Sequence, residues 1–239
     1  MVSPDGSEPT DNGDLPKKAP QAATCVSFGD FKSREAADPH VPNAERGAMR
    51  AQARVAYEQA LQIDSQCLPA FLGLAHLYSA QGEQARALEM YEKALNVNPS
   101  LALGWYEMGM CFTRLKEWEQ ARQHLEKALG LEPDNRQYAT TLGFCLAHMG
   151  LYEDSLAVFL KVTDKAEAHY RVARMAHHLK YDEVCLDFLH RALRENPDFA
   201  PAQQLLRQVE GQPAAASPPL PQADGAKQEE KAGPAGQGN

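Results

Sequence analysis

The chain has 239 residues, 44% of them hydrophobic, which is enough apolar content for an ordered core over part of its length. Its formal net charge is −8, and lysine and arginine are scattered among glutamate and aspartate, so we expect no nucleic-acid partner, because that would require a basic stripe. No window of 18 consecutive apolar residues occurs, so we also expect no membrane span.

Residues 1–43 are expected to be a disordered leader. The stretch up to Gln21 is polar, and Pro39 and Pro42 stand close enough together to prevent a regular helix around them. No apolar segment of the kind found in secretory signals precedes Cys25, so we expect a cytoplasmic protein. An export signal upstream of this reading frame would instead indicate a place in the cell envelope.

Five cysteines are spread along the chain, namely Cys25, Cys67, Cys111, Cys145 and Cys185. Their number is odd and no two of them have C-x-x-C spacing, so the sequence indicates neither a disulfide framework nor a zinc site. Cys111 and Cys145 are 34 residues apart, and we expect both to be small buried hydrophobic residues. A reducing compartment is the simpler interpretation.

A small residue recurs at a fixed step of 34 residues, and a large residue follows each one four positions later. The four pairs are Ala53 and Tyr57, Ala87 and Tyr91, Ala121 and Leu125, and Ser155 and Phe159. A fifth pair, Cys185 and Leu189, comes after a shorter step of 30. Such a period indicates a stack of similar helical units rather than one globular core with a pocket, and it favours binding over catalysis.

Each unit from residue 68 onward has the pattern of two helices. In 68–101 apolar residues stand at i, i+3, i+4 and i+7, which is one face of a helix, namely at Phe71, Leu74, Ala75 and Tyr78. A break at Gly82 precedes a second helix, and Pro99 ends the unit because proline cannot continue a helix. Units 102–135, 136–165 and 166–199 repeat this plan. The third unit is about four residues short, so its junction with the fourth should be tighter.

The combined pattern resembles the tetratricopeptide repeat (TPR) family. The signature, aromatic-x2-Leu-Gly/Ala-x2-Tyr followed by Ala-x3-Phe/Tyr-x2-Ala-x4-Pro, is met at essentially every position in 68–101 and 102–135. Ala139 and His169 replace its first large aromatic residue in units three and four. The resemblance implies an all-α, right-handed α-solenoid of helix-turn-helix repeats with disordered N- and C-terminal tails. It says little about function, because this family carries out many unrelated binding tasks.

The regions that flank the four units carry separate expectations. Residues 44–67 look like the second helix of an incomplete N-terminal repeat that lacks its first helix. Residues 200–210 look like the capping helix that a solenoid needs, and 211–239 look like a disordered tail rich in Ala, Pro and Gly. Because the incomplete repeat would leave an apolar helix face uncovered, self-association is an alternative that stays open.

In the TPR family the first helices line a concave groove through positions 2, 5, 9, 12 and 13 of each repeat. The resemblance therefore implies a groove with aromatic and thioether side chains in its middle and cationic ones toward its C-terminal end. The candidate peptide-binding residues are His76, Tyr106, Met110, Arg114, Thr140, Phe144, His148, Tyr170, Arg171, Arg174 and His177. Aromatic residues beside arginine are typical of binding hot spots, and an acidic group of the partner is expected near Arg174. The alternative is that these are ordinary solvated helix faces.

The sequence favours neither an enzyme nor a metal or cofactor site. It contains no G-x-S-x-G, no Gly-rich phosphate loop and no H-E-x-x-H, and its acidic residues are scattered. His177 and His178 are adjacent on a helix and point about 100° apart, so they seldom bind one ion. The four histidines of 166–199 leave pH-sensitive binding as an open alternative.

The sequence thus predicts a non-catalytic protein-interaction module or scaffold that binds a protein or peptide partner. Some repeat domains of this family clamp a C-terminal carboxylate with Lys and Asn, but Leu72 and His76 stand at the corresponding positions here, so that clamp is not expected. The alternative function is an envelope-assembly or secretion accessory protein whose export signal is missing from this reading frame.

Overall fold

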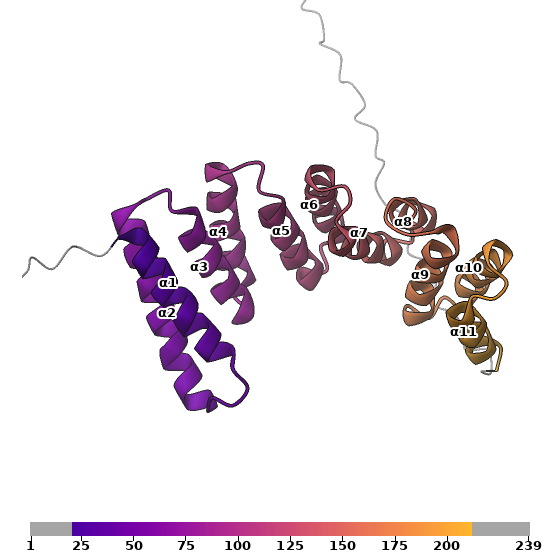
Figure 1. Ribbon diagram of the computed structural model, residues 1–239, viewed down its shortest axis with the longest axis horizontal. Coiled ribbons are helices and arrows are strands. Elements are labelled where there is room, and N and C mark those ends of the chain that lie inside the picture. Colours follow the sequence, from indigo (N-terminus) through magenta and orange to yellow (C-terminus); the bar gives the residue numbers. More distant parts are fainter. Residues whose placement is uncertain (1–20, 212–239) are drawn as a thin grey trace, which may run out of the picture. The chain divides into compact units, whose positions relative to one another are not determined.

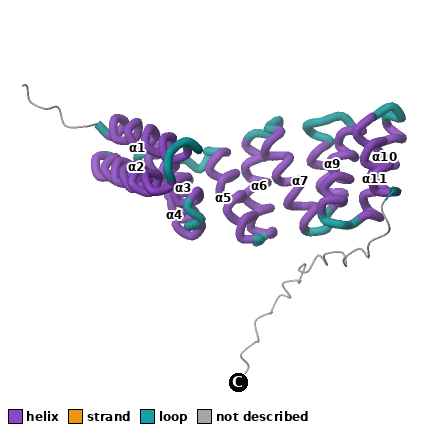
Figure 2. Tube along the Cα trace, turned by 90° about the horizontal axis from the view of Figure 1, so that it is seen from below, coloured by secondary structure: helices purple, strands orange, loops and turns teal. Residues whose placement is uncertain are grey.

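The computed structural model describes residues 21–211, so the first 20 residues of the expected leader and the expected tail from 212 onward lie outside the described residues. Within this range every regular element is an α-helix, and there are eleven of them (Figure 1, Figure 2). None of these eleven helices combines the length and the apolar character needed to cross a membrane. The all-α class expected from the sequence is confirmed. The described residues divide into two compact units, 21–81 and 82–211.

The first unit contains α1 (Ala22–Ala37), α2 (Asn43–Ile63) and α3 (Leu68–Ala80), and each of these helices contacts the other two. The expectation of a disordered leader is wrong for residues 22–37, which form α1 alongside α2 (Figure 1). Pro39 and Pro42 lie in the turn between the two helices and interrupt neither. The helix expected within 44–67 therefore has a partner, and the uncovered face that suggested self-association is covered.

Small residues allow α1 and α3 to pack closely on α2. A Cβ atom on Gly29 of α1 would lie 2.6 Å from Cε1 of Tyr57, and a Cβ on Gly73 of α3 would clash with the same ring. The hydroxyl of Tyr57 donates a hydrogen bond to Oδ1 of Asp30 at 2.8 Å, so its polar atom is satisfied although the ring is buried. Tyr57 is thus the side chain around which the three helices of this unit are assembled.

The second unit contains eight helices in sequence. They are α4 (Gln84–Val97), α5 (Ala102–Leu115), α6 (Trp118–Leu131), α7 (Arg136–His148), α8 (Tyr152–Phe159), α9 (Lys165–His178), α10 (Asp182–Glu195) and α11 (Ala200–Glu210). Each helix contacts the next one along the chain, and α5, α7, α9 and α11 also contact one another in that order. Helices α5 to α10 are therefore three hairpins whose first members form a row with α11.

Two large residues of the 34-residue step, Leu125 and Phe159, lie where the two helices of a hairpin cross, against Gly109 and Gly143. In this second unit, the small and the large residue of each repeated pair are fully buried, namely Ala87, Tyr91, Ala121, Leu125, Ser155, Phe159, Cys185 and Leu189. A Cβ on Gly143 would lie 2.7 Å from Cε2 of Phe159, so this crossing requires glycine. Ser155 replaces alanine without leaving a polar atom unpaired, because its hydroxyl donates to the carbonyl oxygen of Gly143 at 2.9 Å. The period in the sequence therefore records close helix approach.

The sequence repeat 136–165 is shorter than the others because its second helix, α8, has 8 residues, whereas α6 and α10 have 14 each. Helix α8 ends at Phe159, and α9 begins at Lys165 with Asp164 as its N-cap. The Asp164 carboxylate accepts a hydrogen bond from the backbone N–H of Glu167 at 2.9 Å. This cap defines the start of α9 at a junction that lacks the proline found at the end of the other sequence repeats.

Candidate functional site

A hollow of about 480 Å³ lies between α5, α7 and α9. Because these helices are neighbours in one row, side chains from all three contribute to a single surface. The lining residues are Met110, Thr113 and Arg114 from α5, Thr140, Thr141 and Phe144 from α7, and Arg174 and Met175 from α9. The structure thus brings together five of the candidate peptide-binding residues, namely Met110, Arg114, Thr140, Phe144 and Arg174.

The floor of this α5–α7–α9 hollow is largely apolar. Met110 and Phe144 are half-buried, and Met175 is buried. The hydroxyl of Thr140 donates to the carbonyl oxygen of Arg136 at 2.6 Å, and the other two threonines bond to carbonyls of their own helices in the same way. Because these hydroxyl protons are used within the helices, the threonines offer a ligand mainly methyl groups and acceptor oxygens.

Two arginines flank the floor, Arg114 from α5 and Arg174 from α9, and both are exposed. Within residues 21–211, Arg174 has no ion-pair or hydrogen-bond partner. Arg171 differs, because its Nε donates to Oε1 of Glu167 at 2.7 Å and its Nη1 donates to Oγ1 of Thr140 at 3.3 Å. The charge of Arg171 is therefore neutralised inside the chain, while that of Arg174 is available at the hollow.

Tyr106 was expected to line the groove, but it is buried instead. Its ring stacks on Tyr138 of α7 with centroids 4.7 Å apart, and Gln137 donates to its hydroxyl at 3.1 Å. Tyr170 is also occupied, because its ring packs edge-on against Phe199 with centroids 5.4 Å apart. Both tyrosines join neighbouring parts of the fold, and neither lines the hollow.

His148 supports a wall of the hollow without lining it. Its ring stacks on Trp118 with centroids 4.2 Å apart and meets Phe144 edge-on at 4.3 Å. Burial lowers the pKa of His148, and the positive charges of His178 and Lys116 lower it further. The imidazole is therefore neutral near pH 7 and packs beside Phe144 as an aromatic ring.

His177 is engaged within the chain, because its Nδ1 lies 3.3 Å from Oδ1 of Asp182. This carboxylate stands four residues after His178, yet its contact is with His177. Between residues 21 and 211 no three His, Cys, Asp or Glu side chains gather closely enough to hold a metal ion.

His76 belongs to another hollow, within the first unit, of about 580 Å³ between α1, α2 and α3. Leu72 and His76 of α3 line it together with Arg34 of α1 and Arg50 of α2. This hollow depends on α1, which was not expected from the sequence. His76 therefore belongs to a different compact unit of the chain from the other candidate residues.

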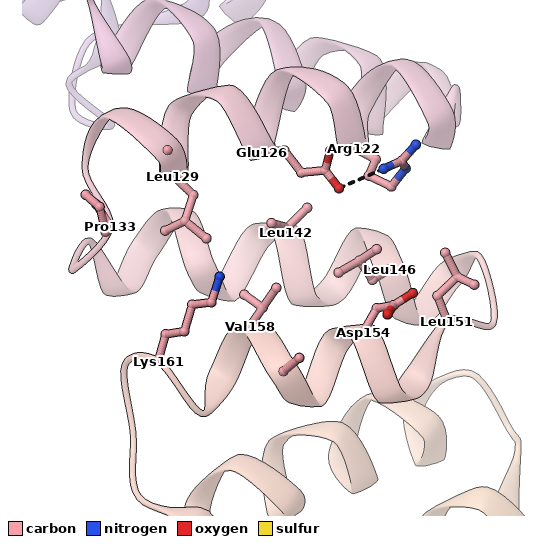
Figure 3. A pocket seen from close by; sticks show the side chains of 12 residues that line it. Arg122, Glu126, Leu129, Pro133, Leu142, Leu146, Leu151, Asp154, Val158 and Lys161 are labelled. Atoms are coloured by element: carbon pink, nitrogen blue, oxygen red, sulfur yellow. Dashed lines mark hydrogen bonds and ion pairs between the residues drawn. The ribbon is translucent and has the colours of Figure 1, made fainter.

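A third hollow, of about 620 Å³, lies between α6, α7 and α8 (Figure 3). Figure 3 shows Leu129, Leu142 and Val158 pointing into it from the three helices. Its charges are mixed: Nη1 of Arg122 lies 2.7 Å from Oε1 of Glu126, and the other charged lining residues are Asp154 and Lys161. Sequence reasoning missed this hollow, because it involves second helices, to which the family resemblance assigned no groove. The α5–α7–α9 hollow is the stronger candidate, since its charges are of one sign.

Successive helical hairpins that cross at small residues, with a hollow along their first helices, define the class of TPR-like repeat proteins. Residues 71–181 match the family model described as the cilia and flagella-associated protein 70 middle TPR-like domain. The chain is a TPR-like domain protein, as the sequence pattern predicted.

Among the solved structures similar to this chain are those of YrrB and MamA. YrrB, described as a TPR protein with an unusual peptide-binding site, is 23% identical, and the match covers 77% of this chain and 91% of YrrB with a TM-score of 0.56. MamA is 17% identical, and the match covers 75% of this chain and 93% of MamA with a TM-score of 0.57. Comparison with curated protein sequences gives no match. At these identities the likeness concerns the fold.

Proposed function

We propose that this protein is a non-catalytic interaction module whose α5–α7–α9 hollow binds a peptide segment of a protein partner. The observation that carries the proposal is an apolar floor beside Arg174, a cation without a partner between residues 21 and 211. Methionine, aromatic and arginine side chains are enriched in protein interfaces. The likeness to YrrB, described as having a peptide-binding site, supports this class of ligand.

The contacts of such a peptide would be made by side chains. Helices α5, α7 and α9 use their backbone N–H and C=O groups internally, so they present no free strand edge to which a peptide could add. An apolar side chain of the peptide would rest on Met110 and Phe144, and methionine adapts its shape to different partners. The peptide backbone would remain hydrated or donate to threonine oxygens.

The test selects peptides from a random display library on the full-length chain and measures the affinity of the best binder by fluorescence anisotropy. Met110→Ser should weaken binding roughly tenfold, because it removes part of the apolar floor. Leu131→Ser is the matched control, because Leu131 is an apolar residue of α6 that is 38% exposed and lies outside the hollow. If no peptide is selected, or if Met110→Ser binds like wild type with its helical circular dichroism intact, the proposal is wrong.

A further inference from the structure

Positive charge gathers along the α5–α7–α9 row although the whole chain has a net charge of −8. The Lys and Arg residues of these three helices are Arg114, Arg136, Lys165, Arg171 and Arg174. Their only acidic residues are Glu107 and Glu167, and both are engaged. Glu167 pairs with Arg171, and Glu107 accepts a hydrogen bond from Tyr91 at 3.5 Å. No acidic side chain lines the hollow itself.

The guanidinium group of Arg174 is suited to a carboxylate. Its planar fork of N–H donors matches the two oxygens of a carboxylate, and charge-assisted bonds of this kind are stronger than bonds between neutral groups. Inside the chain Arg171 already pairs with a carboxylate, because its Nε donates a hydrogen bond to Oε1 of Glu167. Arg174 stands three residues later and lacks such a partner within residues 21–211, so a ligand would have to supply the carboxylate.

The floor restricts where that carboxylate can be in the peptide. Arg174 lines the same hollow as Met110 and Phe144, so a single short peptide segment can offer an apolar side chain to the floor and an acidic one to Arg174. In an extended peptide, side chains two residues apart point to the same side and lie roughly 6.5–7 Å apart along the chain. One apolar residue and one acidic residue at that spacing would reach the floor and Arg174 from a single segment.

We propose that the α5–α7–α9 hollow recognises an extended acidic peptide in which a large apolar residue stands two positions from an aspartate or glutamate. The apolar side chain rests on Met110 and Phe144, and the carboxylate pairs with Arg174. This inference rests on the proposed peptide-binding function and adds the chemistry of the partner.

The experiment is a double-mutant cycle on the full-length chain. The probe is the tightest peptide from the display selection that shows the apolar-x-acidic spacing, together with its variant in which the acidic residue is replaced by its amide. On the wild-type chain the amide variant should bind about tenfold more weakly, as expected for loss of a charge-assisted pair. On Arg174→Gln the two peptides should bind within about twofold of each other. Arg194→Gln is the control, because Arg194 is an exposed arginine of α10 outside the hollow.

The outcomes separate the two proposals. Selected peptides that lose affinity with Met110→Ser but lack the apolar-x-acidic spacing would overturn this inference and leave the peptide-binding function standing. A tenfold amide effect that persists in Arg174→Gln, or that disappears equally in Arg194→Gln, would also overturn it. Failure to obtain any peptide sensitive to Met110→Ser would overturn both.

Discussion

At the scale of single residues, a neighbouring aromatic ring decides whether a helix-surface position faces solvent. Tyr106 and His148 both stand at positions that the repeat pattern assigns to the groove. Tyr106 stacks instead on Tyr138, and His148 stacks on Trp118. In each case the stacking partner comes from another helix, so the position within the repeat does not reveal it. For His148 this packing also has a consequence for the pH dependence of stability.

We expect the unfolding free energy to fall as the pH drops below 6.5. Burial, followed by the charges of His178 and Lys116, lowers the pKa of His148 from its ordinary value of 6.5. The unfolded chain therefore binds a proton at pH values where the folded chain does not, and acidification favours unfolding. Burial lowers the pKa of His169 as well, so it contributes in the same direction. The contribution of these two histidines to the unfolding free energy is fully present above pH 6.5. It is lost as the pH falls toward the lower pKa of the folded state.

Urea denaturation of the full-length chain at a series of pH values checks this. His148→Phe keeps an aromatic ring against Trp118 and should flatten the pH dependence, leaving the part due to His169. His40→Gln is the control for removal of a histidine as such, because His40 lies exposed in the turn after α1. An equally steep slope in wild type and His148→Phe would contradict the expectation.

At the scale of helices, the sequence pattern located the α9–α10 hairpin, although a step of 30 precedes its pair Cys185 and Leu189, but it missed the α1–α2 hairpin. Gly143 precedes Phe159 by 16 residues, whereas Gly29 precedes Tyr57 by 28. Both glycines meet the large residue of the partner helix, so α1 and α2 form a hairpin of the same kind with an insertion. Because of these extra residues, α1 does not stand at the sequence position where the 34-residue step predicts a first helix. A search for a small residue facing Tyr57, rather than for a fixed step, could have found it.

The α1–α2 hairpin predicts opposite effects for two Gly→Ala substitutions. A Cβ on Gly29 would lie 2.6 Å from Tyr57, so Gly29→Ala should lower the unfolding free energy by about 1–3 kcal/mol through overpacking. Gly47 lies within α2 with nothing near its Cβ position, so Gly47→Ala should raise it by about 0.5–1 kcal/mol through helix propensity. Urea denaturation measures both. A Gly29→Ala variant as stable as Gly47→Ala would show that α1 does not pack on Tyr57.

The candidate site could be predicted from the sequence only in part, for a related reason. Repeat positions identify which residues of a first helix face the row, and this was sufficient for Met110, Phe144 and Arg174. They do not indicate which of these residues are already paired. Whether Arg171 or Arg174 is available depends on Glu167, four residues before the first of them and seven before the second. A check for acidic residues at i−4 would have separated the two arginines.

At the scale of the whole molecule, each hairpin of a repeat protein is stabilised mainly by its neighbours. Helix α11 contributes Leu205 and Val209 to a buried cluster that includes Cys185, whereas Cys145 belongs to the preceding cluster. All five cysteines are free and buried, and they occur in both units of the chain. Burial raises the pKa of Cys145 and of Cys185 to about 12, so both thiols are protonated and inert while folded. Thiol reactivity therefore reports, site by site, where the chain opens.

Disrupting α11 should therefore expose first the cysteines of the hairpin next to α11 and later those of hairpins farther from it. Leu205→Asp places a charge in the buried cluster, and we expect Cys185 to react with a thiol reagent at least about tenfold faster than in wild type, ahead of Cys145. Cys25 and Cys67 belong to the first unit and should stay slow. Mass spectrometry of tryptic peptides after timed labelling assigns each rate. Gln204→Asp, at an exposed position of the same helix, should leave all five rates unchanged. Equal acceleration of all five cysteines by Leu205→Asp would mean that the chain opens as one cooperative body, and the neighbour-by-neighbour account of its stability would then be wrong.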